Sequence, residues 1–148
     1  MKDEPSVQTS QATSPKALVL YADGGISPQA AGAGVVVQNE RGQVVLVTNR
    51  TLQRMTNNEA EYHGLLLALE AARRLRARQI EIRLDSEVVV YQMIGKFAVR
   101  SAALKPLHRQ ACALARQFKG VTYCHIPREQ NQIANALAGE AVRGRRWR

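Results

Sequence analysis

The spacing of apolar residues changes along this chain, and each change marks a different kind of secondary structure. Short apolar runs bounded by turn residues predict buried strands, whereas apolar residues that recur every three or four positions predict amphipathic helices. The predicted strands cover residues 17–22, 32–37, 44–50, 80–84 and 121–126. The predicted helices cover residues 57–77, 86–94, 104–118 and 130–142. Asp23, Gly24 and Gly25 follow the first strand and are interpreted as a turn.

The order of these elements predicts an α/β fold with a five-stranded mixed sheet. The first three strands follow one another through short turns, as in an antiparallel meander. The later strands alternate with helices, and a strand–helix–strand connection of this kind is right-handed and pairs its strands in parallel. We therefore expect a three-strand meander plus two parallel strands, flanked by helices. We assign residues 16–142 to this one domain, residues 1–15 to a disordered polar tail and residues 143–148 to a basic tail.

The longest predicted helix carries an acid in an unusual place. Thr56 and Glu59 have the spacing of a capping box, which predicts that the helix begins at Asn57. On a helical projection, Glu61 falls in the middle of the apolar stripe, one turn before Leu65. A carboxylate in a core-facing position is costly unless a cation meets it there. The alternative is that Glu61 is an ordinary first-turn acid, which favours a helix N-terminus.

Two further acids are expected near Glu61. Asp23 follows the first strand and Asp85 follows the fourth, and these two strands should be parallel neighbours. The carboxyl ends of parallel strands form the usual ligand-binding edge of an open α/β sheet. Taken singly, Asp23 can be a turn residue and Asp85 a helix cap. Together with Glu61 they predict a site for Mg²⁺ or Mn²⁺, because oxygen ligands suit these cations and clustered carboxylates otherwise repel one another.

Composition narrows the choice of partners. The chain of 148 residues has a formal net charge of +9, which favours a polyanion, with nucleic acid ahead of an anionic membrane surface. A divalent-metal site on a basic protein points to phosphodiester chemistry. No apolar run approaches the roughly 20 residues of a membrane span, and the N-terminus lacks the apolar stretch of a secretory signal. Cys112 and Cys124 have no metal-binding spacing, so we expect a reduced, cytoplasmic protein with no membrane partner.

Four regions of the sequence carry a resemblance to a known family. They are Tyr21-Ala22-Asp23-Gly24-Gly25, Thr56-Asn57-Asn58-Glu59-Ala60-Glu61-Tyr62, Leu84-Asp85-Ser86, and Pro127-Arg128-Glu129-Gln130-Asn131 with Ala134-Asn135-Ala136-Leu137-Ala138. Each region alone is a weak signal, but together, in this order and with this spacing, they are specific. Over residues 16–142 the chain resembles type 1 ribonuclease H, in the branch with a short loop before the last helix and no basic protrusion.

The resemblance implies an activity, a cofactor and a set of site residues. The implied activity is endonucleolytic hydrolysis of the RNA strand of an RNA/DNA hybrid with two Mg²⁺ ions, for which Mn²⁺ can substitute. By the same match, the metal ligands would be Asp23, Glu61, Asp85 and the residue at position 135, Asn135. Substrate contacts are implied for Gly24, Gly25, Thr56, Asn57, Asn58 and Asn131. We expect a monomer that needs no protein partner.

Asn135 departs from the family pattern, which usually has a fourth Asp at this position. An amide can still offer its carbonyl oxygen to a metal, but the ligand set loses one negative charge. We therefore expect weaker metal binding, for which Mn²⁺ compensates in part. Two hypotheses follow, an active nuclease with an Asp-Glu-Asp-Asn ligand set or a catalytically inactive module that binds hybrid. The presence of Asp23, Glu61 and Asp85 together favours the active enzyme.

Two basic features complete the expectations. Family members with a long loop before the last helix carry a catalytic His in that loop. In the short-loop branch an Arg takes its place, and Arg128 matches this position. An arginine can stabilise phosphate charge but does not act as a base. The alternative is that Arg128 is an ordinary surface residue. His125, separately, is interpreted as a residue of the fifth strand. The segment after Gly95 is too short for a basic protrusion, so the arginines of residues 143–148 are candidates for binding phosphates. We expect this tail to be mobile, with packing against the domain as the alternative.

Overall fold

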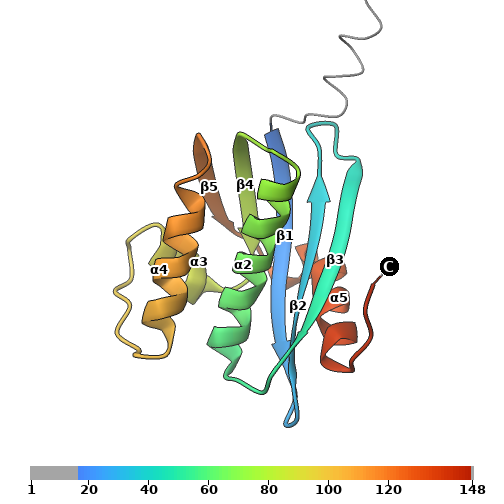
Figure 1. Ribbon diagram of the computed structural model, residues 1–148, viewed down its shortest axis with the longest axis vertical. Helices are drawn as coiled ribbons and strands as arrows, with labels where there is room; N and C mark the ends of the chain where they lie inside the picture. Colours follow the sequence, from blue (N-terminus) through green and yellow to red (C-terminus); the bar gives the residue numbers. More distant parts are fainter. Residues whose placement is uncertain (1–16, 148) are drawn as a thin grey trace, which may run out of the picture.

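The computed structural model describes residues 17–147, so the predicted disordered tail at residues 1–15 lies outside the described part of the chain. One sheet is covered by helices on both faces (Figure 1). Its strands are β1 (Ala17–Ile26), β2 (Ala31–Gln38), β3 (Val44–Leu52), β4 (Gln79–Leu84) and β5 (Gly120–His125). The helices are α2 (Asn57–Arg74), α3 (Glu87–Met93), α4 (Leu104–Ala115), α5 (Gln132–Val142) and a short 3-10 helix, η1 (Arg128–Gln130). Within residues 17–147, no helix is both long enough and apolar enough to cross a membrane.

The sheet has the predicted mixed topology. Its strands lie in the order β3-β2-β1-β4-β5. β2 pairs antiparallel with both β1 and β3, whereas β4 pairs parallel with both β1 and β5. The parallel register sets Ala22 opposite Leu84, so the residues that follow them, Asp23 and Asp85, are neighbours at one edge of the sheet.

The alternation of side chains along β2 separates the two faces of the sheet. The residues that join the main hydrophobic core with α2 are Ala33, Val35 and Val37. The glycines that alternate with the first of them face α5. A Cβ atom on Gly32 would lie 2.6 Å from the carbonyl oxygen of Ala138, and one on Gly34 would lie 2.5 Å from that of Ala134. α5 therefore lies against the backbone of β2, an approach that a larger side chain would prevent.

The first strand is longer than predicted, and the predicted turn at Asp23, Gly24 and Gly25 is wrong. β1 continues to Ile26, because these three residues pair with β2 in regular antiparallel register. The turn comes instead at residues 27–30. Asp23 is therefore held in a paired strand, which fixes its backbone more firmly than a turn would.

All four helices are shorter than predicted, α3 by one residue at each end. α2 ends at Arg74, and the φ angle of 59° at Arg76 is incompatible with a continuing right-handed helix. α4 ends at Ala115, after which tight turns lead into β5. α5 begins at Gln132, because the preceding residues form η1 and Asn131 takes the N-cap position.

The residues after α5 lie along the edge of the sheet, and we call residues 143–147 the C-terminal strap. Gly144 has a φ angle of 79°, which redirects the chain after the helix. In Figure 1 the dark red end of the chain runs beside β3 and α5. The side chain of Asn49 in β3 donates to the carbonyl oxygen of Arg145 at 2.9 Å and accepts from the backbone N–H of Trp147 at 2.9 Å. Residues 143–147 of the basic tail therefore pack against the domain. This is the alternative to the mobile tail that was expected.

Candidate metal centre

Three carboxylates meet at the edge of the sheet where the parallel strands end. Asp23 comes from β1, Glu61 from the start of α2, and Asp85 directly follows β4. One oxygen atom from each side chain lies within 4.8 Å of the others. Asp23 and Glu61 are buried and Asp85 is half-buried. The structure thus brings together the three acids that the sequence pattern placed near one another.

Two glycines allow α2 to bring Glu61 to Asp23. A Cβ atom on Gly24 would lie 2.0 Å from the carbonyl oxygen of Ala60, and one on Gly64 would lie 2.6 Å from that of Asp23. α2 and β1 are therefore in contact backbone to backbone, which only glycine permits. The backbone N–H of Gly24 donates to Oε1 of Glu61 at 3.0 Å and fixes this carboxylate against the strand.

Burial and mutual repulsion make the charged forms of these acids costly in the absence of a cation. Burial, followed by the charges of Glu61 and Asp85, raises the pKa of Asp23 to about 9. Burial also raises the pKa of Glu61 to about 7, although the N–H of Gly24 opposes this shift. Oδ2 of Asp85 is buried and has no hydrogen-bond partner within residues 17–147. Converging oxygen donors, one of them unpartnered, fit a divalent cation such as Mg²⁺ or Mn²⁺.

The acids open into a pocket that also contains a positive charge. Asp23 and Glu61 line a pocket of about 700 Å³ together with Arg128 and Asn135. Nη2 of Arg128 donates to Oδ1 of Asn135 at 3.0 Å, and the guanidinium is close enough to Glu61 to lower the pKa of this carboxyl in part. Nδ2 of Asn135 is buried without a hydrogen-bond partner in the described part of the chain. The pocket therefore combines carboxylates for a cation with a guanidinium for an anion.

The residues expected to contact a substrate are distributed unevenly around this pocket. Those that line it are Gly24, Gly25 and Asn57. Thr56 and Asn58 are exposed and do not belong to its lining. The hydroxyl of Thr56 is engaged in the predicted capping box, because it donates to Oε1 of Glu59 at 2.9 Å and accepts from the N–H of Glu59 at 3.2 Å.

Asn131 is buried beneath the start of α5. It is 1% exposed, and its Nδ2 donates to the carbonyl oxygen of Ala22 at 2.9 Å. This hydrogen bond ties the N-cap of α5 to the strand residue that precedes Asp23. Such burial favours a positioning role for Asn131 over direct contact with a substrate. His125, by contrast, ends β5 as an exposed residue outside the pocket lining, in agreement with its interpretation as a strand residue.

The pocket lining also includes residues that were not predicted to bind the metal or the substrate. They include Ile26, Ser27, Gln29, Ala138, Gly139 and Val142. Arg143 lines the pocket as well, although the sequence indicated it only as part of the basic tail. A signal for it was available, because positions 135, 139 and 143 repeat at the four-residue spacing of one helix face. Ser27 and Gln29 gave no such signal, since their place depends on how far β1 extends.

The sequence and the fold of this chain are similar to those of known proteins. Residues 22–141 match a protein family described as reverse transcriptase-like. The crystal structure of RNase H1 from the halophilic archaeon Halobacterium salinarum NRC-1 is 34% identical in sequence with a TM-score of 0.84, and the match covers 86% of this chain and 98% of that one. The structure of LC11-RNase H1 in complex with an RNA/DNA hybrid is 31% identical with a TM-score of 0.81, over 86% of this chain and 97% of that one.

A curated relative adds a longer protein to the comparison. The bifunctional protein Rv2228c of Mycobacterium tuberculosis H37Rv is 40% identical over 128 residues, which cover 84% of this chain. The match covers 35% of Rv2228c, so this chain spans about a third of the length of that relative. The matched family model, the fold and these relatives agree. The chain belongs to the type 1 ribonuclease H family of hydrolases.

Proposed function

We propose that this protein is a metal-dependent endonuclease that hydrolyses the RNA strand of RNA/DNA hybrids. The observation that carries the proposal is the convergence of Asp23, Glu61 and Asp85 within 4.8 Å on a chain with a net charge of +9. Clustered carboxylates need a cation, and a basic protein attracts a polyanion. The choice of substrate is supported by LC11-RNase H1, which is described in complex with an RNA/DNA hybrid. We assign the activity to a single chain without an obligate protein partner.

The three carboxylates would hold two Mg²⁺ ions, or Mn²⁺ in their place, and Asn135 would add a neutral oxygen. When bound, such ions activate water and stabilise negative charge on the phosphate. The burial of Asp23 and Glu61 strengthens their attraction for a cation, because charges interact more strongly away from water. The N–H of Gly24 holds the carboxylate of Glu61 against β1.

We assign Arg128 to binding the phosphate group that undergoes hydrolysis. It lines the same pocket as Asp23 and Glu61, and its guanidinium has N–H donors beyond the one given to Asn135. An arginine cannot take up a proton at neutral pH, so Arg128 stabilises charge and does not act as a base. Asn57, the first residue of α2, lies where the N–H groups of a helix terminus favour a second phosphate of the same strand.

Asn135 decides how strongly the metals are held. Its Oδ1 accepts from Arg128, so the same oxygen would have to serve a guanidinium and a cation. This sharing and the missing charge predict weaker metal binding than a fourth carboxylate would give. The same observation favours the second candidate function, a catalytically inactive module that binds hybrid through the retained fold and basic surface.

A cleavage assay on labelled duplexes distinguishes the two functions. The full chain is incubated with an RNA/DNA hybrid, and with RNA/RNA and DNA/DNA duplexes of the same sequence as controls, first in Mg²⁺ and then in Mn²⁺. We expect the RNA strand of the hybrid to be cut in both metals, faster in Mn²⁺, and not in EDTA. Binding of the hybrid without cleavage at every metal concentration would establish the inactive module. Cleavage of the DNA/DNA duplex at the same rate would contradict the assigned substrate.

A further inference from the structure

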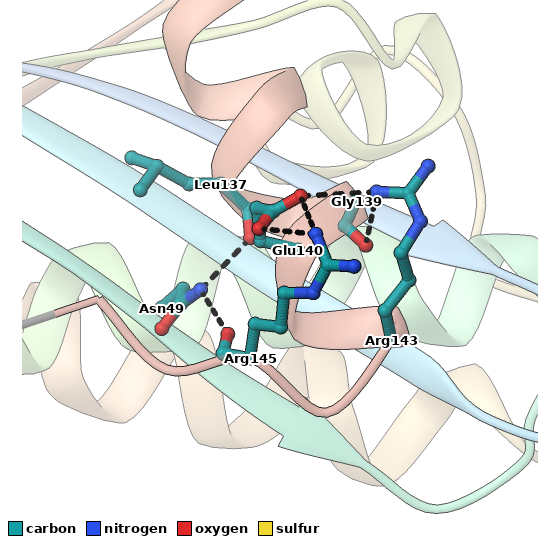
Figure 2. A network of polar contacts seen from close by, with 6 residues as sticks. All are labelled: Asn49, Leu137, Gly139, Glu140, Arg143 and Arg145. Carbon is teal, nitrogen blue, oxygen red and sulfur yellow. Dashed lines mark hydrogen bonds and ion pairs between the residues drawn. The ribbon is translucent and has the colours of Figure 1, made fainter.

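A buried side chain holds the C-terminal strap in place. Asn49 is 7% exposed, and its Nδ2 donates to the carbonyl oxygens of Leu137 at 3.0 Å and Arg145 at 2.9 Å (Figure 2). Its Oδ1 accepts from the N–H of Trp147 at 2.9 Å. One amide therefore joins β3, α5 and the strap, and both of its ends are satisfied. The strap has a defined position on the domain.

Glu140 of α5 holds two arginines of this region. Its Oε2 accepts from Nη1 of Arg143 at 3.1 Å, and its Oε1 accepts from Nη1 of Arg145 at 3.2 Å (Figure 2). Nη1 of Arg143 also donates to the carbonyl oxygen of Gly139 at 3.3 Å. Both guanidinium groups are thus held through Nη1 alone by partners within residues 17–147. Because a guanidinium has five N–H donors, each arginine keeps donors for an incoming anion.

The hollow between the strap and α5 carries an excess of positive charge. It has a volume of about 620 Å³, and its lining contains three arginines, Arg143, Arg145 and Arg146, against one carboxylate, that of Glu140. The hollow therefore suits an anion with several charged oxygens, which arginine binds through paired donors. Trp147, which is 55% exposed, adds an aromatic surface to the same lining.

This hollow adjoins the pocket of the candidate metal centre. Asn135, Gly139 and Arg143 line both the strap hollow and the pocket that contains Asp23 and Glu61. The three shared residues lie at four-residue intervals, so one face of α5 connects the acids to the strap. A nucleic-acid strand with one phosphodiester group at the acids can therefore lay its neighbouring phosphates along this face.

We propose that the C-terminal strap binds the sugar-phosphate backbone of the hybrid on one side of the cleavage point. In this proposal Asn49 is a positioning residue that holds the strap ready for the substrate. The proposal rests on the proposed function, because it takes the same hybrid as its ligand. Arginines that are fixed before binding lose less conformational freedom when the substrate arrives, which strengthens binding.

Binding measured without cleavage tests the strap separately from catalysis. A fluorescently labelled hybrid is titrated with the full chain in EDTA, and its anisotropy is recorded at several salt concentrations. The test variant is Arg145→Gln/Arg146→Gln. The matched control, Arg78→Gln/Arg116→Gln, removes the same charge from two exposed arginines at the opposite end of the sheet, before β4 and after α4. We expect the test variant to raise Kd about tenfold and to lower the slope of log K against log salt by roughly 1 to 2, with little change in the control.

Trp147 provides a second readout, because it is the only tryptophan in the chain. The variant Asn49→Ala keeps every arginine but removes the anchor of the strap. In the free protein we expect acrylamide to quench the fluorescence of Trp147 more strongly in this variant than in the wild type. We also expect hybrid binding to weaken about fivefold, because the strap must then be ordered on binding. In cleavage assays the loss should raise KM and leave kcat unchanged.

The outcomes distinguish failure of the strap from failure of the whole function. An unchanged Kd and salt slope in Arg145→Gln/Arg146→Gln would overturn the role of the strap. Equal losses in the test and control variants would also overturn it, because only total charge would then matter. A wild-type chain that neither binds nor cuts the hybrid would overturn the proposed function as well. If the wild type binds and cuts the hybrid and the test variant is unaffected, only the role of the strap would be overturned.

Discussion

Asp23 must be charged to bind a cation, yet its charge destabilises the buried site in the absence of that cation. This conflict is stronger than at Glu61. The pKa of Asp23, about 9, lies far above the roughly 3.9 of an unfolded Asp. A carboxyl group whose pKa rises on folding stabilises the fold fully only below its unfolded pKa, and this contribution is lost as the pH rises to the folded value. Without metal, the wild-type protein should therefore become less stable between about pH 4 and about pH 9.

The variant Asp23→Asn tests this conflict, because its amide does not titrate. In EDTA at pH 8 we expect Asp23→Asn to gain about 2 kcal/mol in the free energy of unfolding, which corresponds to roughly 4–8 °C in Tm. The gain should shrink as the pH falls towards 4. Thermal unfolding of both proteins across this pH range provides the measurement, and a difference in Tm that stays constant with pH would contradict the explanation.

In the proposed metal site Asn135 is a neutral ligand, and the variant Asn135→Asp measures what a fourth negative charge would contribute. We expect the Mg²⁺ concentration for half-maximal cleavage to fall about tenfold, which corresponds to about 1.4 kcal/mol of binding free energy. This is well below the roughly 4 kcal/mol of a bare charge pair, because Arg128 already contacts this side chain. Turnover at saturating metal should change little. Metal titrations of cleavage by both forms give the result. Identical titrations would mean that Asn135 does not contact the metal, and activity in Asn135→Asp alone would identify a disabled site.

At the scale of elements, the contact between β1 and α2 decides whether the acids meet. A Cβ atom on Gly24 would lie 2.0 Å from the carbonyl oxygen of Ala60, so Gly24→Ala must push the helix away from the strand. We expect this variant to lose about 3 kcal/mol or more in the free energy of unfolding. The matched control is Gly25→Ala, whose Cβ atom would have its nearest neighbour at 3.8 Å and should leave stability almost unchanged. Urea unfolding compares the two, and equal stabilities would show that the close approach is not required.

The periodicity of the sequence predicted which elements form but not where each one ends. The meander of the first three strands and the parallel pairing of β4 with β1 followed from the order of the elements, and the start of α2 followed from the capping box of Thr56. The extension of β1 to Ile26 followed from neither, because it depends on pairing with β2 and glycines alone suggest a turn. The same applies to the start of α5, where the buried Asn131 is tied to β1.

In the molecule as a whole, the convergence of the three acids could be predicted because each of them occupies a position that a sequence pattern marks. Asp23 and Asp85 lie at or near strand ends, and Glu61 falls on the buried stripe of a helix. The structures that support them could not be predicted in the same way. Asn49, for example, bonds residues 88 to 98 positions further along the chain, and no local pattern specifies such partners. The path of the strap along β3 therefore emerged only from the structure.

We propose that Asp23, Glu61 and Asp85 hold the metals for cleavage of the hybrid. The most direct test is the rate of cleavage by Asp85→Asn at saturating Mn²⁺, compared with the wild type and with Glu87→Gln. Glu87 is a suitable control because it is an exposed acid near Asp85 that lies outside the cluster. We expect Asp85→Asn to retain its fold and to cut the RNA strand at least about a thousandfold more slowly, with Glu87→Gln close to the wild type. Full activity in Asp85→Asn would contradict the assignment of these three residues as metal ligands.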